Sequence, residues 1–130
     1  MILVEGRNPV GWFEIPVTDV MRARKFYESS FDVKMNLMEG QGAKMALFPM
    51  HDGAEGAAGA LVQASGYKPV YDGPMIYFSV KSIDEALSKI QQAGGKVMKD
   101  KTDIGEHGMY AIIQDGEGNR IGLHANKNKN

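Results

Sequence analysis

The sequence predicts an α+β fold in which two tandem βαβββ units carry curved mixed sheets that form an open cup. Three observations predict it. A strand, a helix cap and an amphipathic helix occur twice in the 130 residues. Matched residues of the two copies are separated by a constant offset of 63 positions, as Val17 is from Val80. Each helix is followed by short strand-like segments and turn formers, which together indicate a duplicated unit.

The helix of the second half has the clearest signals. Ser82 and Glu85 form an S-x-x-E capping box at its start, and Gly94-Gly95 ends it. The segment 75–80 before it is short and rich in β-formers, which predicts a strand. The apolar residues recur at helical spacing and share one face: Ile83, Ala86, Leu87, Ile90 and Ala93.

The first half repeats this order. Residues 12–17 form a strand candidate in which Pro16 suits an edge or terminal position, and Asp19 is a good N-cap for the next helix. The offset of 63 holds without a gap to the last strand of each copy. It pairs Ala23 with Ala86, Met35 with Met98, Gly42 with Gly105, 52–53 with 115–116, and Gly59 with Gly122.

The remaining strands of the second copy are expected at 96–98, 109–114 and 120–124, with a turn at 115–119. We therefore expect a single domain, 1–130. Its parts are a first unit at 9–63, a connector at 64–74 and a second unit at 75–125.

Composition excludes several classes of protein. The chain has 15 basic and 16 acidic residues, a net charge of −1 and no basic stripe, so we expect no nucleic-acid partner. It has no cysteine, which excludes disulfides, thiolate zinc sites and thiol nucleophiles. No apolar run approaches the length of a membrane span, so we expect no membrane association and a cytoplasmic location.

Alternation along the strands assigns side chains to two faces. Phe13, Ile15 and Val17, with their counterparts in the second copy, should pack on the helices. The opposite face should line the cup and bind a small molecule, although a second apolar core or a dimer surface is the alternative. Its predicted residues are Trp12, Glu14, Leu61, Met75, Tyr77, Gly122 and His124, with Gly59 beside them and His107 in a loop above.

Three motifs carry a family resemblance: Val17-Thr-Asp19, Lys25-Phe-Tyr27 and the segment 115–123. With the duplicated units they resemble the vicinal oxygen chelate superfamily from about Pro9 to Ala125. That superfamily includes glyoxalase I, extradiol dioxygenases, fosfomycin-resistance enzymes and bleomycin-resistance proteins. The resemblance implies the cup-shaped fold, a small-molecule ligand and a homodimer.

Metal-dependent members hold an ion with His, Gln or Glu at four places, which fall here on Trp12, Gly59, Met75 and Gly122. None of these residues offers a suitable donor, so we expect no cofactor at the usual site. A displaced site for Zn, Fe, Mn or Ni would use Glu14, His124 and His107. We favour instead hydrogen bonds of Glu14 and His124 with each other or with a ligand.

Three functions remain open. In the first, a glyoxalase-related protein binds a planar apolar molecule between Trp12, Tyr77 and Met75 without the usual metal. In the second, a lyase, isomerase or dioxygenase-like enzyme uses His124 as general base, Glu14 as its partner or as acid, and Tyr77 as a donor to a developing oxyanion, with or without a displaced metal ion. In the third, the cup of an interaction module is filled by another protein chain.

Overall fold

The computed structural model describes residues 2–127, so residues 1 and 128–130 of the expected domain lie outside the described range. No helix in this range is both long and apolar enough to span a membrane. The elements in chain order are β1 (Trp12–Pro16), α1 (Val20–Phe31), β2 (Asn36–Gly40), β3 (Ala43–Leu47), β4 (Ala58–Ala64), β5 (Tyr77–Ser79), α2 (Ile83–Gln92), β6 (Lys96–Asp103), the 3-10 turn η1 (Gly105–His107), β7 (Met109–Gln114) and β8 (Arg120–Ala125).

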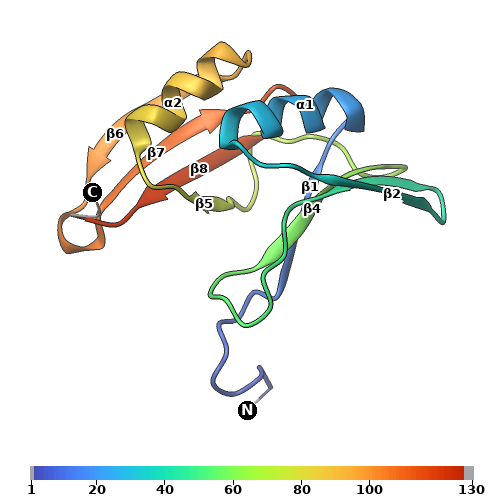
Figure 1. Cartoon of the computed structure of the whole chain (residues 1–130), viewed down its shortest axis with the longest axis horizontal. Coiled ribbons are helices and arrows are strands. Elements are labelled where there is room, and N and C mark those ends of the chain that lie inside the picture. The colour runs from blue at the N-terminus through green and yellow to red at the C-terminus, as the bar shows by residue number, and fades with distance from the viewer. Residues whose placement is uncertain (1, 128–130) are drawn as a thin grey trace.

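The strands form two four-stranded mixed sheets, which confirms the predicted α+β fold of two βαβββ units. Sheet A has the order β1-β4-β3-β2 and sheet B the order β5-β8-β7-β6. In each, the strand before the helix pairs in parallel with the last strand of its unit, and the other pairs are antiparallel. Both helices lie on the same side, and the two sheets diverge below them without closing on each other (Figure 1).

Both helices begin at the predicted caps. The Asp19 side chain accepts a hydrogen bond from the amide of Arg22 at 3.1 Å, and Ser82 Oγ accepts one from the amide of Glu85 at 3.1 Å. After α2, Gly94 has a φ of +102°, a left-handed conformation that favours glycine and ends the helix. Local sequence signals therefore fixed these boundaries.

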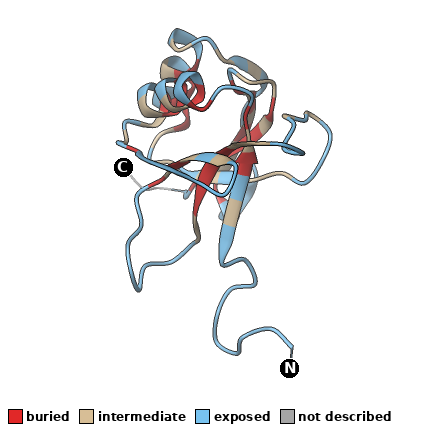
Figure 2. Cartoon of the chain, turned by 90° about the vertical axis from the view of Figure 1, so that its right-hand side faces the viewer, coloured by how far each residue is buried: buried red, intermediate tan, exposed pale blue. Residues whose placement is uncertain are grey.

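One core joins the two units between the helices and the sheets (Figure 2). An aromatic cluster connects the two units, with Phe31 and Phe78 from different units at a centroid distance of 4.7 Å. The cluster consists of Phe13, Tyr27, Phe31, Phe48 and Phe78. Because the rings come from both units, neither unit buries its apolar face alone.

The prediction of an ungapped 63-residue register is wrong in the last strands. Val17 donates to the carbonyl of Val62 and Val80 to that of His124, both at 2.9 Å, so β4 and β8 match at 62 positions. Ala46 pairs with Leu61 and Ala111 with Leu123, so β3 and β7 match at 65 positions. The second unit is therefore two residues longer before this strand and three residues shorter after it, which gives a net change of one.

The register error changes the predicted face of one residue. Leu61 is the partner of Ile15 in β1, on the helix side, and its exposed fraction is 0%. Placing Leu61 on the open face is therefore wrong, because it packs in the core as Leu123 does beside Phe78.

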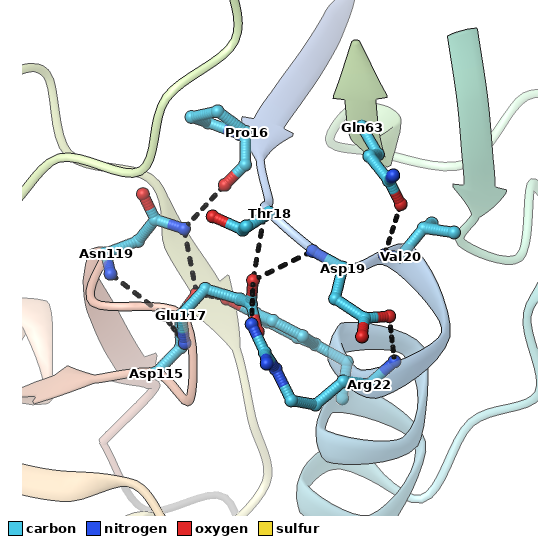
Figure 3. Close-up of polar contacts among 10 residues, drawn as sticks. Pro16, Thr18, Asp19, Val20, Arg22, Gln63, Asp115, Glu117 and Asn119 are labelled. Carbon is cyan, nitrogen blue, oxygen red and sulfur yellow. Dashed lines mark hydrogen bonds and ion pairs between the residues drawn. The ribbon is translucent and has the colours of Figure 1, made fainter.

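The turn at 115–119, here called the clasp, joins the second unit to the first (Figure 3). Asn119 Nδ2 donates to the carbonyl of Pro16 at 2.8 Å, and the buried hydroxyl of Tyr27 donates to Asp115 Oδ2 at 2.5 Å. Burial, followed by the charge of Asp115, raises the pKa of Tyr27 well above its ordinary value. The sequence identified this segment as a turn and a family motif, and did not reveal that it contacts the other unit.

Glu117 of the clasp caps the first helix. Its Oε1 accepts from the amides of Thr18 at 2.8 Å and Asp19 at 3.2 Å, and its Oε2 accepts from Arg22 Nε at 2.7 Å. The Glu117 side chain is only 1% exposed. Burial acts to raise its pKa, but the bonds from Arg22 and the two amides outweigh burial, and the pKa lies below its ordinary value.

Candidate functional site

On the open face of sheet A, a carboxylate is held between two aromatic side chains. Trp12 Nε1 donates to Glu14 Oε2 at 3.2 Å, and the Tyr67 hydroxyl donates to Glu14 Oε1 at 2.9 Å. Trp12 is 42% exposed and Tyr67 41%, so both rings are open to solvent. The hydrogen bond to Glu14 and its negative charge raise the pKa of Tyr67. This arrangement fixes the carboxylate while leaving ring faces free for a ligand.

The rest of this face is small and apolar. The strand registers place Ala60 and Leu47 beside Glu14, and Val62 and Met45 in the next row. Glu14 is the one ionisable residue that the strands of sheet A place on the open face. Ala60 and Val62 are themselves buried, so a ligand lying on sheet A would chiefly contact the exposed Trp12 and Tyr67 rings and the partly exposed Leu47 and Met45, beside one negative charge.

Sheet B presents an aromatic ring on its open face. Tyr77 is 49% exposed and lies beside Gly122, where an added Cβ would be 2.4 Å from the Tyr77 ring. Gly122 therefore lets the ring lie directly against the strand. The half-buried Met75 precedes the strand.

His124 lies further along the same face, beside Ser79 of β5. Its Nε2 is 2.6 Å from the carbonyl oxygen of His107, which requires the ring to donate from Nε2 and links the η1 turn to β8. His124 is thus engaged with His107 and not with Glu14, whose partners are Trp12 and Tyr67. The expected hydrogen bond between Glu14 and His124 is not formed within one chain.

The residues at the four implied metal positions do not fit a divalent ion. The corrected register places Ala60, not Gly59, as the counterpart of Gly122. Gly59 faces the helix side, where an added Cβ would be 2.6 Å from the Phe13 ring. Alanine offers no donor either, and at the Gly122 position the Tyr77 ring occupies the space that a ligating side chain would need.

The displaced metal site is not assembled in this chain. Within residues 2–127, no three His, Cys, Asp or Glu side chains gather closely enough to hold a metal ion. Glu14 lies in sheet A, whereas His124 and His107 are joined to each other in and beside sheet B.

A cavity of about 550 Å³ lies at the seam between the units. Met75 and Tyr77 line it together with Phe13 and Phe78, while Trp12, Glu14 and His124 lie outside it. The predicted site residues therefore divide into two groups, one on each sheet, and a single chain does not enclose them in one pocket.

Sequence reasoning missed Tyr67. It lies between β4 and β5, in a stretch of turn formers with no strand or helix periodicity that could assign its face. Only the fold brings its hydroxyl to Glu14, which is 53 positions away in the chain.

Comparison with known proteins gives a consistent result. Residues 10–123 match the family model of the Glyoxalase/Bleomycin resistance protein/Dioxygenase superfamily. The protein named "Putative glyoxylase CFP32" in Mycobacterium bovis and Mycobacterium tuberculosis is 29% identical over 116 residues, which cover 86% of this chain. The chain spans 43% of the length of these relatives.

Three solved structures illustrate the likeness of fold. A glyoxylase/bleomycin resistance protein/dioxygenase domain from Frankia has a TM-score of 0.72 at 17% identity, covering 92% of this chain and 98% of its own. TnmS3 from Streptomyces, described as an antibiotic binding protein, has a TM-score of 0.67 at 20% identity and covers 95% and 100%. Glyoxalase I from Zea mays has a TM-score of 0.67 at 18% identity and covers 90% and 46%. The chain belongs to the glyoxalase/bleomycin resistance protein/dioxygenase superfamily.

Proposed function

We propose that this protein binds a small planar organic molecule on the open faces of its sheets, without a divalent metal at the family's usual position. The observation that carries the proposal is the Glu14 carboxylate held by Trp12 and Tyr67 on an otherwise apolar face. Exposed rings stack on a planar ligand, and the carboxylate attracts a positive or hydrogen-bond-donating group on it. The ligand class is therefore a planar, largely apolar cation.

The second wall of the site comes from sheet B of a second copy in a homodimer. Tyr77, Met75 and His124 would then face the group around Glu14, with Gly122 under the Tyr77 ring and His107 at the edge. The divergence of the two sheets within one chain supports this arrangement (Figure 1). The fold shared with TnmS3, an antibiotic binding protein, supports the binding of an organic molecule.

The test uses the single tryptophan of the chain, Trp12, as a reporter. Proflavine, a planar cation, is titrated by fluorescence and calorimetry, with the anionic dye fluorescein for comparison. We expect proflavine to bind, with Glu14→Gln weakening it about tenfold because one charge-assisted contact is lost. Glu39→Gln, which removes an exposed acid from the other face of sheet A, should leave the affinity unchanged.

Three results would count against the proposal. They are no saturable binding of proflavine, an affinity insensitive to Glu14→Gln, and loss of binding on treatment with a chelator. Sedimentation analysis tests the dimer separately. A monomer that binds proflavine with full affinity would show that sheet B of a second copy is not part of the site.

An alternative function is a lyase or isomerase of the glyoxalase type. The observation that favours it is the similarity to CFP32, which is named as a glyoxylase. Glu14 and His124 lie on different sheets, so such a reaction would need the opposed sheets of two copies. Turnover of a methylglyoxal–glutathione adduct that is lost in both Glu14→Gln and His124→Ala would establish this alternative over simple binding.

A further inference from the structure

The cavity of about 550 Å³ between the units, here called the seam cavity, is lined by rings of the aromatic cluster. Phe13 packs on Phe48 at a centroid distance of 5.5 Å and edge-on to Phe78 at 5.8 Å, and all three rings belong to the lining. Phe13 and Phe78 are nevertheless only partly buried. Apolar ring surface therefore remains accessible beside an otherwise packed core, where an apolar group would gain by covering it.

The seam cavity lies where the two sheets are not paired. The edge strand of sheet A is β1 and the edge strand of sheet B is β5, and both contribute residues to the lining. Among the described residues, β1 pairs only with β4 and β5 only with β8, so no strand ladder joins the two edges. The segment 48–57 supplies most of the remaining wall. The fold thus leaves a space between the units that side chains alone border.

The seam cavity adjoins the site around Glu14 within a single chain. Trp12, which donates to Glu14, pairs in register with Ala58 of β4, and Ala58 lines the cavity. Neighbouring strands lie about 4.8 Å apart, so a ring system stacked on Trp12 would lie next to the cavity. Met75 and Tyr77 line the cavity from the other unit. A ligand held at Trp12 and Glu14 could therefore extend a substituent into the space between the units.

The charges of the lining fit an uncharged substituent on a cationic ligand. Among the described lining residues, Glu55 is the one carboxylate and His51 the one histidine, and none is a lysine or arginine. Both side chains are exposed and come from the segment 48–57, whereas the aromatic floor carries no charge. The interior therefore favours an apolar group, and the wall does not repel a positive charge.

We propose that the seam cavity takes an aromatic substituent of the ligand, so that the ligand class is a planar cation carrying a pendant aromatic ring. This role of the cavity rests on the proposed function, because the ring system held at Trp12 and Glu14 positions the substituent. The pendant ring packs against Phe13 and Phe78, and the flexible Met75 side chain adapts to its shape. The volume of the cavity lies in the range of small-ligand sites.

The test compares two cationic dyes, acridine yellow G and benzoflavine, which share one dimethyl diaminoacridine ring system. Benzoflavine differs by a phenyl group on the middle ring. Titrations followed by Trp12 fluorescence should show benzoflavine binding about tenfold more tightly, because its phenyl group leaves water for an apolar cavity. Intermolecular NOEs should join the phenyl protons to the Phe78 ring and the Met75 methyl group. Equal affinities, or phenyl NOEs to other parts of the protein, would overturn the assignment.

Glu14→Gln distinguishes this inference from the proposed function. It should weaken both dyes by the same factor and leave the ratio of their affinities unchanged, because the carboxylate contacts the shared ring system. Unchanged binding of both dyes in Glu14→Gln would contradict the proposed function, whereas a ratio near one in wild type contradicts the role of the cavity. If neither dye binds, both are wrong.

A pair of variants in the same segment locates the pendant ring. Ala57→Leu narrows the cavity and should remove the advantage of benzoflavine while leaving the affinity for acridine yellow G unchanged. Ala54→Leu makes the same change at an exposed position outside the lining and should leave both affinities as in wild type. An advantage of benzoflavine that persists in folded Ala57→Leu, or that is lost equally in Ala54→Leu, would place the phenyl group outside the seam cavity.

Discussion

Replacing Glu117 should destabilise the protein, because its carboxylate accepts the hydrogen bonds that hold the start of α1. Glu117→Ala removes two bonds to the amides of Thr18 and Asp19 and the ion pair with Arg22. Hydrogen bonds from backbone amides to a buried carboxylate contribute about 1.5–3 kcal/mol each at most, and the longer bond at 3.2 Å contributes less. Arg22 is 60% exposed, so its share is about 1 kcal/mol or less.

From these contributions we expect Glu117→Ala to lower the free energy of unfolding by about 3 kcal/mol at pH 7. Glu117→Gln keeps an oxygen that accepts from the amides and should cost about half as much. Arg22→Ala, the matched control, should cost about 1 kcal/mol or less because its side chain is largely solvated. Urea unfolding followed by circular dichroism measures all three.

The pH dependence gives an independent check. The pKa of Glu117 is lowered in the folded protein, so the unfolded chain takes up the proton first as the pH falls. The stabilisation is therefore present above the unfolded pKa of about 4.3 and is lost as the pH falls through the folded pKa. The difference between wild type and Glu117→Ala should shrink over that range. A cost below about 1 kcal/mol at pH 7, or one that does not change in acid, would refute the reasoning.

Three further predictions follow from the packing. The pKa of Tyr27 is raised by burial and by Asp115. Its contribution to the free energy of unfolding is therefore complete below the unfolded pKa of about 10 and is lost as the pH rises through the folded pKa. Alkaline unfolding curves should show this loss in wild type and not in Tyr27→Phe, and identical curves would contradict it. Gly59→Ala should lower the free energy of unfolding by about 2 kcal/mol or more, because the added Cβ meets the Phe13 backbone and ring. Gly122→Ala should cost less, because the half-exposed Tyr77 ring can move aside. Calorimetric melting compares the two variants, and the reverse order of stability would contradict this packing. Leu61→Ala should lower the free energy of unfolding by about 2–5 kcal/mol and leave proflavine binding intact, as expected for a core residue. A folded variant that has lost proflavine binding would instead indicate that Leu61 lies on the open face.

The sequence predicted those features that depend on local signals. Asp19 and Ser82 as caps and the helix end at Gly94-Gly95 are each set by a few neighbouring residues, and all were found. Alternation also placed Trp12, Glu14 and Tyr77 on the open faces, because each position follows from its own strand.

The errors came from counting across a loop. A constant offset assumes that both units have the same spacing between elements, but the second unit is longer before β7 and shorter in the clasp turn, and the faces in β4 changed by one position. A shift of one residue reverses the face of every side chain in a strand, which moved Leu61 from the cup to the core. Tyr67 could not have been found in this way, because its environment is made by segments distant in the chain.

The position of the clasp has a consequence for the order in which the two units fold during synthesis on the ribosome. The amide groups at the start of α1 belong to residues 18 and 19, but their acceptor is Glu117, almost a hundred residues later. While the first unit is being synthesised, these donors can only face water, and its aromatic side chains lack Phe78. The nascent first unit should therefore remain loosely packed and sensitive to protease until the clasp has emerged. Co-expression of the two halves as separate chains, divided within 65–74, should restore protection only when both are present.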